Sequence, residues 1–508
     1  MYKGSEFMRR LLNRLFSVRA LAPKNGTRGE LPGSREAYMN LMRIALPSVC
    51  EMVLISLIGS IDTMMVGGIG TEAIAAVGLV GQPRMLMLCM FFALNTGITA
   101  VVARRKGQGD QDSANRTLRT SLIITTLLSI VMLAVAMTFS RPLMILAGAK
   151  ADTVDDADLY FRIVTAVLPL NALSMAMCAA QRGIGNTRIT MYVNVTSNIV
   201  NVILNYLLIN GVWFFPRLGV QGAAIATAVG LCVGSVLAFI SLIGGKRGNT
   251  NFLHFSIHDK WNIDKPSAQA VLKVGGNSML EQIALRVGFF LYARLVADLG
   301  TQAYASHTVC MQFLNLSFTF ADGIGVASTS LVGQMLGKER PDLSHIYGKI
   351  AQRIAILVAI CIASLMVIFR FPLVGLFTDD HTVMRLSANV MLIVALFQPL
   401  QMLSVITSGA LRGAGDTKFV ARVMLMCVAI IRPVMAFLAI QLITKFFTPV
   451  YYTASVVSAA ETMTYWLAYE APQWALLGAW AASLMDMAVR MTMVMRRFNS
   501  GKWHSIKV

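Results

Sequence analysis

The chain is organised as long apolar segments separated by short polar connections. Segments of roughly 20 or more residues with few or no charges recur along it, and each is long enough to cross ~30 Å of hydrocarbon as a helix. The ten-residue apolar/polar alternation typical of a membrane β-barrel is not seen. We therefore predict an all-α polytopic membrane protein. Twelve transmembrane helices are expected, at residues 40–66, 73–103, 117–139, 157–181, 188–213, 219–244, 271–297, 303–334, 347–370, 384–411, 417–446 and 472–495.

Composition and charge placement support this reading. The 508 residues are 56% hydrophobic and only 14% charged, and the mean hydropathy of +0.64 excludes an ordinary soluble protein. The net charge of +19 is carried by bases in alternate connections, as in Arg104–Lys106, whereas acids such as Asp155 and Asp156 lie in the others. By the positive-inside rule, both termini are expected in the cytoplasm, with the protein in the plasma (inner) membrane. Bases spread in this way do not predict a nucleic-acid groove.

An internal repeat relates the two halves of the chain. GTEAIAA at Gly70 corresponds to GTQAYAS at Gly300, and RGIGNTR at Arg182 corresponds to RGAGDTK at Arg412, so that each second copy follows the first by the same interval. The loop glycines 107 and 337 are separated by that interval as well. With six spans per copy, the halves share one orientation and are related by a pseudo-twofold axis along the membrane normal. Parallel repeats of this kind predict a substrate path between two lobes and alternating access in a monomer.

The repeat and the polar connections divide the chain into five parts. The opening MYKGSEF is expected to be a cloning remnant. The predicted parts are a remnant with a basic cytoplasmic arm (1–37), an N-lobe (38–244), a cytoplasmic linker (245–268), a C-lobe (269–497) and a cytoplasmic tail (498–508).

Asp62 is a carboxylate inside the first apolar span. An acid there costs ~2.5 to 3.5 kcal/mol on insertion scales, so it should face protein or water and have polar partners. The fifth span carries asparagines at intervals of four, three and four, which places their amides on one helical stripe: Asn194, Asn198, Asn201 and Asn205. A carboxylate opposed to amide and hydroxyl oxygens suits Na⁺, and a carboxylate alone can carry H⁺. The alternative is that Asp62 only anchors a packed amide network.

Other charged residues also lie in predicted spans. Glu51 and Glu281 are related by the repeat, and we predict that they face the central cleft and attract a cationic substrate. The alternative is that each binds backbone or arginines within its own lobe, such as Arg286 and Arg294. Asp322 in the eighth span is a candidate cavity residue. The last span carries Asp486 and Arg490, whose spacing predicts an intrahelical ion pair.

Several of these motifs together resemble the multidrug and toxic compound extrusion (MATE) family, in its NorM-like branch. They are ALPSVCEM at Ala45, IDTMMVGGIGTEAIAAVG at Ile61, the two RGxGxT(K/R) connections, SMLEQIALRVGFFLYARLVADLGTQAYASHT at Ser278, and MDMAVRMTMVMRRFNSGKW at Met485. The resemblance covers the chain from about residue 36 to its end. It implies a V-shaped pair of six-helix lobes that exports organic, often cationic, compounds in exchange for Na⁺ or H⁺.

The resemblance also implies positions for the ion sites. An N-lobe site would use Asp62, Asn201, Asn205 and Thr227, and the amide at position 205, where DinF-like members carry an acid, favours the NorM-like branch. The acids that NorM-like relatives often place in the seventh and tenth helices would fall on Leu285 and Gln401. A C-lobe sodium site is therefore in doubt, although Glu281 could form a rearranged one with Gln401.

Two rival functions remain to be weighed. A membrane enzyme would need clustered histidines or metal-spaced ligands, and the six histidines are scattered, so we expect no catalysis and no cofactor beyond the coupling ion. The other rival is a flippase for lipid-linked or anionic substrates, which would present a cationic cavity. The candidate residues for such a cavity are Arg84, Arg286, Arg294 and Arg432. The sign of the charge in the central cavity would distinguish this flippase from an exporter of cations.

Overall fold

The computed structural model describes residues 17–22, 26–150, 153–213, 215–243, 252–255, 261–446 and 471–506. In this part of the chain the regular elements are helices only. They are η1 (Arg19–Leu21), α2 (Ser34–Gly67), α3 (Thr71–Gln108), α4 (Gln111–Thr138), α5 (Ser140–Leu146), α6 (Val154–Ala166), α7 (Leu168–Gly183), α8 (Thr187–Asn210), α9 (Gly219–Ile243), α10 (Lys265–Ala297), α11 (Thr301–Gly337), α12 (Pro341–Ile368), α13 (Arg370–Gly375), α14 (His381–Gly413), α15 (Thr417–Met424), the π-helical segment η3 (Leu425–Ile431), α16 (Arg432–Phe446) and α19 (Ala471–Asn499).

The helices account for the predicted spans. Within the described residues, nine are long and apolar enough to cross a membrane, and the bent pair α6 and α7 makes a tenth. The helices α10 and α19 occupy the places of the seventh and twelfth predicted spans, and they are less apolar because they carry charged residues such as Glu281 and Asp486. Most helices extend a few residues beyond the predicted limits, since a helix can continue past the hydrocarbon into the polar boundary.

The fourth span is not one straight helix. It is broken between α6 and α7, which meet at an angle of 50°. Pro169 lies in the first turn of α7, where its missing N–H costs nothing, and its ring disfavours a straight continuation of α6 through this point. Hydropathy predicted the span, and the proline explains the bend.

The outer faces of the helices expose large apolar side chains. On α4, for example, Leu127, Ile130 and Val131 are each more than half exposed. Such a surface would be costly in water and is the expected contact with lipid. Separate apolar cores lie inside each lobe, for example around Phe91 and Phe161 in the N-lobe and around Phe397 and Trp480 in the C-lobe.

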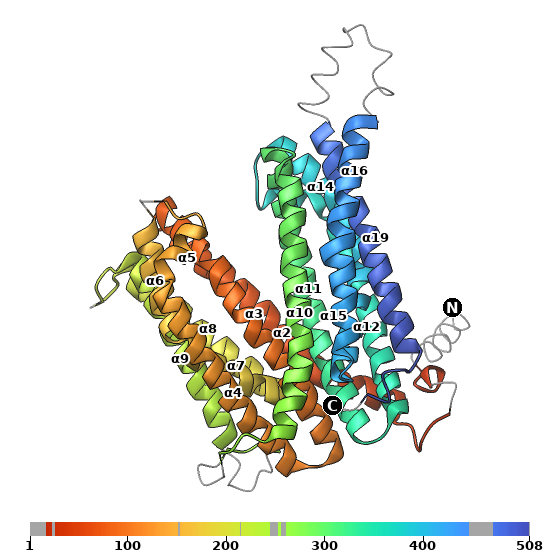
Figure 1. Ribbon diagram of the computed structural model, residues 1–508. Coiled ribbons are helices and arrows are strands. Elements are labelled where there is room, and N and C mark those ends of the chain that lie inside the picture. The colour runs from red at the N-terminus through yellow and green to blue at the C-terminus, as the bar shows by residue number, and fades with distance from the viewer. Residues whose placement is uncertain are drawn as a thin grey trace, which may run out of the picture.

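The two lobes repeat each other in their helix limits. The first helix of each lobe ends at Gly67 or Ala297, and the second begins at Thr71 or Thr301, again with the interval of the sequence repeat. In Figure 1 the lobe that contains α2 to α9 and the lobe that contains α10 to α19 diverge as a V toward one end of the molecule. The repeat predicted from the sequence motifs is therefore also present in the arrangement of the helices.

The lobes join at the opposite end, where α2 packs against α11, α10 against α3, and α3 against α11. Gly107 and Gly337, a repeat-related pair, lie at the last crossing. A Cβ on Gly107 would come 1.9 Å from the Gln334 carbonyl oxygen, and one on Gly337 would come 2.0 Å from that of Arg104. Only glycine allows the two backbones to approach this closely.

The predicted linker, residues 245–268, is described only at 252–255 and from 261 onward. Its described parts lie against α4, because the Asn115 side chain accepts from the His254 backbone N–H at 3.0 Å. Asp264 then caps α10 by accepting hydrogen bonds from the side chain and backbone of Ser267. These bonds lower the pKa of Asp264. The C-lobe thus begins as helix at Lys265, slightly before the predicted boundary.

Candidate ion-coupling site and the charged groups of each lobe

The structure brings Asp62 of α2 together with Asn205 of α8. The Asn205 side-chain amide donates to the Asp62 carboxylate. Asn205 is completely buried, and its side-chain oxygen has no hydrogen-bond partner among the described residues. A buried acceptor without a donor is costly, and a water molecule, another proton donor or a cation can satisfy it.

A second pair of polar groups lies on the same face of α8. The Asn201 amide donates to the Thr227 hydroxyl of α9 at 3.1 Å, and that hydroxyl is 3.5 Å from the Tyr160 hydroxyl of α6. Four helices of the N-lobe thus contribute polar side chains to one region. Helical spacing pointed to Asn201 and the family resemblance to Thr227, but neither pointed to Tyr160, because an aromatic residue in an apolar span is usually a packing residue.

The other two amides of the stripe point elsewhere. The Asn198 amide donates to the Asn194 carbonyl oxygen of its own helix at 2.8 Å, and the Asn194 amide donates to Glu51 at 2.6 Å. Asn198, a predicted site residue, is therefore on the helix that forms the site but is not directed at Asp62. The stripe serves two acids, one at each end.

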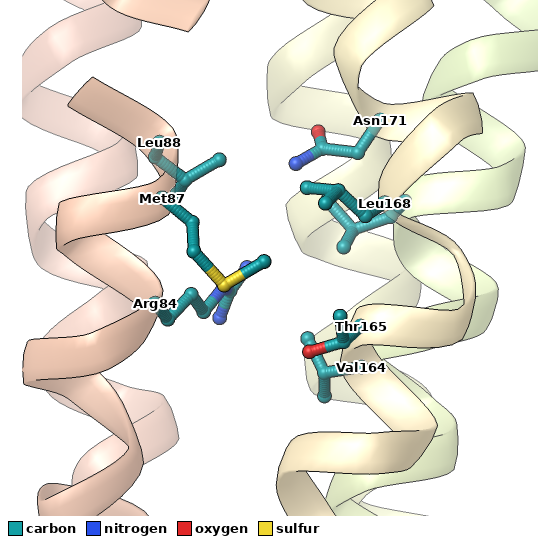
Figure 2. Close-up of a pocket in the computed structure, with 8 residues that line it drawn as sticks. Arg84, Met87, Leu88, Val164, Thr165, Leu168 and Asn171 are labelled. Carbon is teal, nitrogen blue, oxygen red and sulfur yellow. The ribbon is translucent and has the colours of Figure 1, made fainter. Parts of the chain in front are cut away.

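Arg84 of α3 supplies a positive charge close to this region. Its field acts on both Asp62 and Tyr160. Figure 2 shows Arg84 and Met87 of α3 facing Thr165 and Leu168 of the bent α6–α7 pair. The cavity between them is about 10 Å³, which is room for about one water molecule. Arg84 therefore lies near the Asp62 carboxylate, whose described hydrogen-bond donor is Asn205.

Glu51 lies in a separate cluster of α2, α7 and α8. It is fully buried and accepts from Arg182 at 2.5 Å, from the Thr190 hydroxyl at 2.8 Å and from Asn194. The geometry supports the intralobe alternative for this residue, with a partner other than the two arginines considered from the sequence. This partner, Arg182, is the first residue of the repeated RGIGNTR motif. Its recurrence in both halves, like that of the glutamate, was the sequence signal for the pair.

Glu281 repeats this arrangement in the C-lobe. It is 1% exposed, and the Arg412 guanidinium donates to both of its carboxylate oxygens. Arg412 is the repeat counterpart of Arg182, as Glu281 is of Glu51. Each lobe is therefore closed internally by one glutamate–arginine pair, placed between its first helix and its RGxGxT connection.

The remaining C-lobe candidates are not gathered into one site. Gln401 is fully buried, and neither its oxygen nor its nitrogen has a partner among the described residues. Glu281 is paired with Arg412, not with Gln401. Asp322 is exposed although α11 packs against α14, α2 and α3, so it lies on a face that these helices leave open. Arg412 and Glu281 are the charges that act on it.

A buried charged group deeper in the C-lobe corrects one expectation. Asp486 pairs with Arg432 of α16 at 2.7 Å, not with Arg490 of its own helix. Arg432 is 3% exposed, which removes it from the exposed arginines that a cationic cavity would need. Arg490 is also buried, and two of its nitrogens have no partner among the described residues. The spacing in the sequence predicted a pair with Arg490 on the same helix, whereas the packing of α16 against α19 brings Arg432 to Asp486.

Two repeated helical lobes with lipid-facing outer surfaces and a partly buried polar site in one of them are the architecture of a polytopic membrane transporter. Comparison with known proteins identifies the family. A sequence model named MatE matches residues 47–207 and again residues 278–438, which together are more than half of the chain. The two matches also coincide with the two lobes. The chain belongs to the MATE family of multidrug efflux transporters.

Named relatives and solved structures agree with this assignment. The chain is 27% identical over 471 residues to a probable multidrug resistance protein NorM of Thermotoga maritima, covering 92% of this chain and 93% of that protein. It is 25% identical to the multidrug resistance protein NorM of Vibrio cholerae, over 74% and 82% of the two chains. A crystal structure of a mutant of the Vibrio cholerae MATE transporter VcmN superposes with a TM-score of 0.79 at 17% identity, over 92% and 99%. These relatives are transporters, and the NorM-like reading of the sequence is confirmed.

Proposed function

We propose that the protein is a secondary active antiporter that exports small organic compounds, mainly cations, in exchange for Na⁺ or H⁺. The observation that carries the proposal is the Asp62–Asn205 contact. A half-buried carboxylate that accepts from an amide lies next to a buried amide oxygen that has no partner among the described residues, and a cation would complete this arrangement. An acid retained inside a membrane span despite its cost is expected to have such a task.

The same residues bear on the chemistry of coupling. Asp62, the free oxygen of Asn205 and the Thr227 hydroxyl would offer oxygen ligands to Na⁺, and Asp62 alone would carry H⁺. In the present arrangement the nitrogens of Asn201 and Asn205 donate to Thr227 and Asp62. Of these bonds, only the one from Asn205 reaches Asp62, and it leaves the oxygen of the same amide without a partner among the described residues. The arrangement is thus consistent with a site ready to receive the ion.

The lobes would move as two units. Repeat-related glutamate–arginine pairs stiffen each lobe internally, which supports rigid-body rocking about the joined end. Asp322, exposed on α11, is the acid best placed to attract a cationic substrate. The exposed acid favours a cationic substrate, and the burial and pairing of Arg432 remove one of the four arginines that a flippase for anionic lipid-linked substrates would use.

The orientation follows from the charge pattern. The joined end of the lobes carries the basic connections, including Arg104–Lys106 and Arg188, so we place this end in the cytoplasm of a cell with both termini there and the protein in its plasma (inner) membrane. The V would then open outward (Figure 1). A self-contained pair of lobes supports a monomer that needs no cofactor beyond the coupling ion.

The decisive test is efflux of a fluorescent organic cation from proteoliposomes under an imposed Na⁺ gradient or an imposed pH gradient. One of the two gradients should drive efflux by the wild type, and Asp62→Asn should reduce it to the level of protein-free vesicles. Thermal unfolding in detergent should show that the variant is folded. Gradient-driven efflux that survives the substitution would move the coupling to Asp322 or Glu281. A wild type that moves no cation would redirect the search to anionic or lipid-linked substrates.

A further inference from the structure

A second cavity lies at the joined end, between the lobes. It measures about 440 Å³ and is open on one side. Its walls come from α2 and the α7–α8 connection of the N-lobe and from α11 and α12 of the C-lobe. A hydrogen bond crosses it, because the Asn40 amide donates to the Tyr347 hydroxyl at 3.5 Å. Anything that fills this cavity touches both lobes. We call it the seam cavity.

The seam cavity is positively charged. Arg43 of α2 and Arg188 in the first turn of α8 line it, both exposed, and neither forms a hydrogen bond or ion pair with a described residue. The described lining holds the amides of Asn186 and Gln334 but no carboxylate. The α8 N-terminus adds free backbone N–H groups, since the side chain of Asn186, its N-cap, makes no capping bond. Two unpaired guanidinium groups with neutral donors around them select an anion.

The repeat-related position shows what the seam cavity lacks. There Lys273 and Lys418 replace the two arginines, and Asp416 and Arg104 replace Asn186 and Gln334. Asp416 forms an ion pair with Arg497 at 2.7 Å, and Arg104 donates to the Ile506 carbonyl oxygen at 2.7 Å. At the C-lobe position, the basic groups therefore have partners within the chain: the Asp416 carboxylate and the carbonyl oxygen of Ile506 in the C-terminal tail. In the seam cavity no described group pairs with the two arginines, so the anion must come from outside.

The shape and depth of the seam cavity indicate an amphipathic anion. Ile44, Leu331 and Met335 form an apolar wall in the same lining, and they keep 9%, 5% and 8% of their surface exposed. The cavity also lies near the starts of α2, α8 and α12, which is the level of the lipid head groups in the orientation proposed above. A small soluble anion would engage the guanidinium groups alone, whereas a phospholipid also contacts the apolar part of the lining.

We propose that the seam cavity binds the phosphate head group of an anionic phospholipid of the cytoplasmic leaflet. The phosphate oxygens accept from Arg43 and Arg188, and the glycerol and upper acyl chain lie along the wall formed with Leu331. Basic pockets between membrane helices on this side bind such head groups in general. Because the lipid contacts both lobes at their joined end, its binding favours the state in which that end is closed.

The test is a lipid titration of the full-length protein in detergent, followed by thermal unfolding and by native mass spectrometry. Phosphatidylglycerol should raise the unfolding temperature and remain bound, whereas phosphatidylcholine should not. The variant Arg43→Gln/Arg188→Gln should bind phosphatidylglycerol roughly 10- to 30-fold more weakly, given about 1 kcal/mol for each base near a lipid surface. Lys273→Gln/Lys418→Gln is the matched control and should bind as the wild type does. Arg43→Lys/Arg188→Lys should recover part of the affinity and shows that the site still folds.

Three results would overturn the proposal. Equal weakening in the control would mean that any two positive charges at this end suffice. Equal binding of phosphatidylglycerol and phosphatidylcholine would show that the site does not select an anionic head group. Stabilisation by inorganic phosphate or glycerol phosphate at the same concentration as the lipid would make the ligand a soluble phosphate compound. The readout is binding, so it is independent of whether the protein moves an organic cation.

Discussion

The two lobes share a scaffold but not a site. The repeat counterparts of Asp62, Asn201 and Asn205 are Tyr292, Ile431 and Met435. Tyr292 is 3% exposed and packs against His307 and Trp480, with ring centres 5.5 and 6.2 Å away. The counterpart of Thr227 lies outside the described residues. Where the N-lobe holds a carboxylate and amides, the C-lobe holds aromatic and aliphatic side chains.

The continuity of the matching helices differs as well. In the N-lobe α8 runs unbroken from Thr187 to Asn210, whereas its C-lobe counterpart passes through the π-helical segment η3 before α16 begins at the buried Arg432. Both lobes nevertheless keep the glutamate–arginine pair. A repeat can therefore preserve the residues that hold a lobe together while the residues that handle an ion diverge. The comparison predicts equal effects in the shared scaffold and unequal effects in the site.

The largest change in stability is expected from the shared pairs. Glu51→Gln and Glu281→Gln each leave a partly buried arginine without its counter-charge, which costs about 3 kcal/mol, the low end for a buried pair. The low end applies because the Arg182 and Arg412 side chains are 20% and 22% exposed. Thermal unfolding in detergent should show similar decreases in both variants.

Double variants test whether the loss comes from the pairs themselves. Glu51→Gln/Arg182→Gln and Glu281→Gln/Arg412→Gln remove both charges and should recover part of the lost stability. A large decrease in one lobe and none in the other would contradict the view that the scaffold is shared.

The next effect belongs to the N-lobe alone. Asn205→Ala removes a hydrogen bond to a charged group, worth about 1.5–3 kcal/mol, and an oxygen from the proposed ion site. Gradient-driven efflux should slow by roughly tenfold or more. Asn198→Ala is the matched control, since its amide bonds only to its own helix. Equal slowing by the two variants would show that the whole stripe, rather than Asn205, serves the ion.

The smallest effect concerns the joint between the lobes. Gly107→Ala and Gly337→Ala force a methyl group against backbone atoms and should each destabilise the protein by about 1–3 kcal/mol. Gly276→Ala on α10 is the control, because its Cβ would meet nothing within 4 Å. The unfolding temperature of the control should not fall. If both crossing variants also leave it unchanged, the lobes do not require this close approach.

Much of the fold could be predicted from the sequence because the bilayer imposes simple rules. A span must be apolar for a fixed length, and helix is the form that satisfies its backbone. The bend between α6 and α7 is the exception, since hydropathy does not report direction and only Pro169 hinted at it. Helical spacing also placed Asn201 and Asn205 on one face of α8. Spacing could not say that Asn198 turns to its own backbone, because that choice is a rotamer.

The sequence by itself determined the number of spans, the internal repeat with its constant interval and the presence of acids that need partners. Only the tertiary structure decided which partner each acid has. It paired Glu51 with Arg182 and Asp486 with Arg432, and it left Arg43 and Arg188 together at the seam. The physical reason is that periodicity fixes the face of a helix, whereas a contact between distant residues depends on how whole helices pack. In a low-dielectric interior that packing selects the pairs that leave the fewest charges unsatisfied.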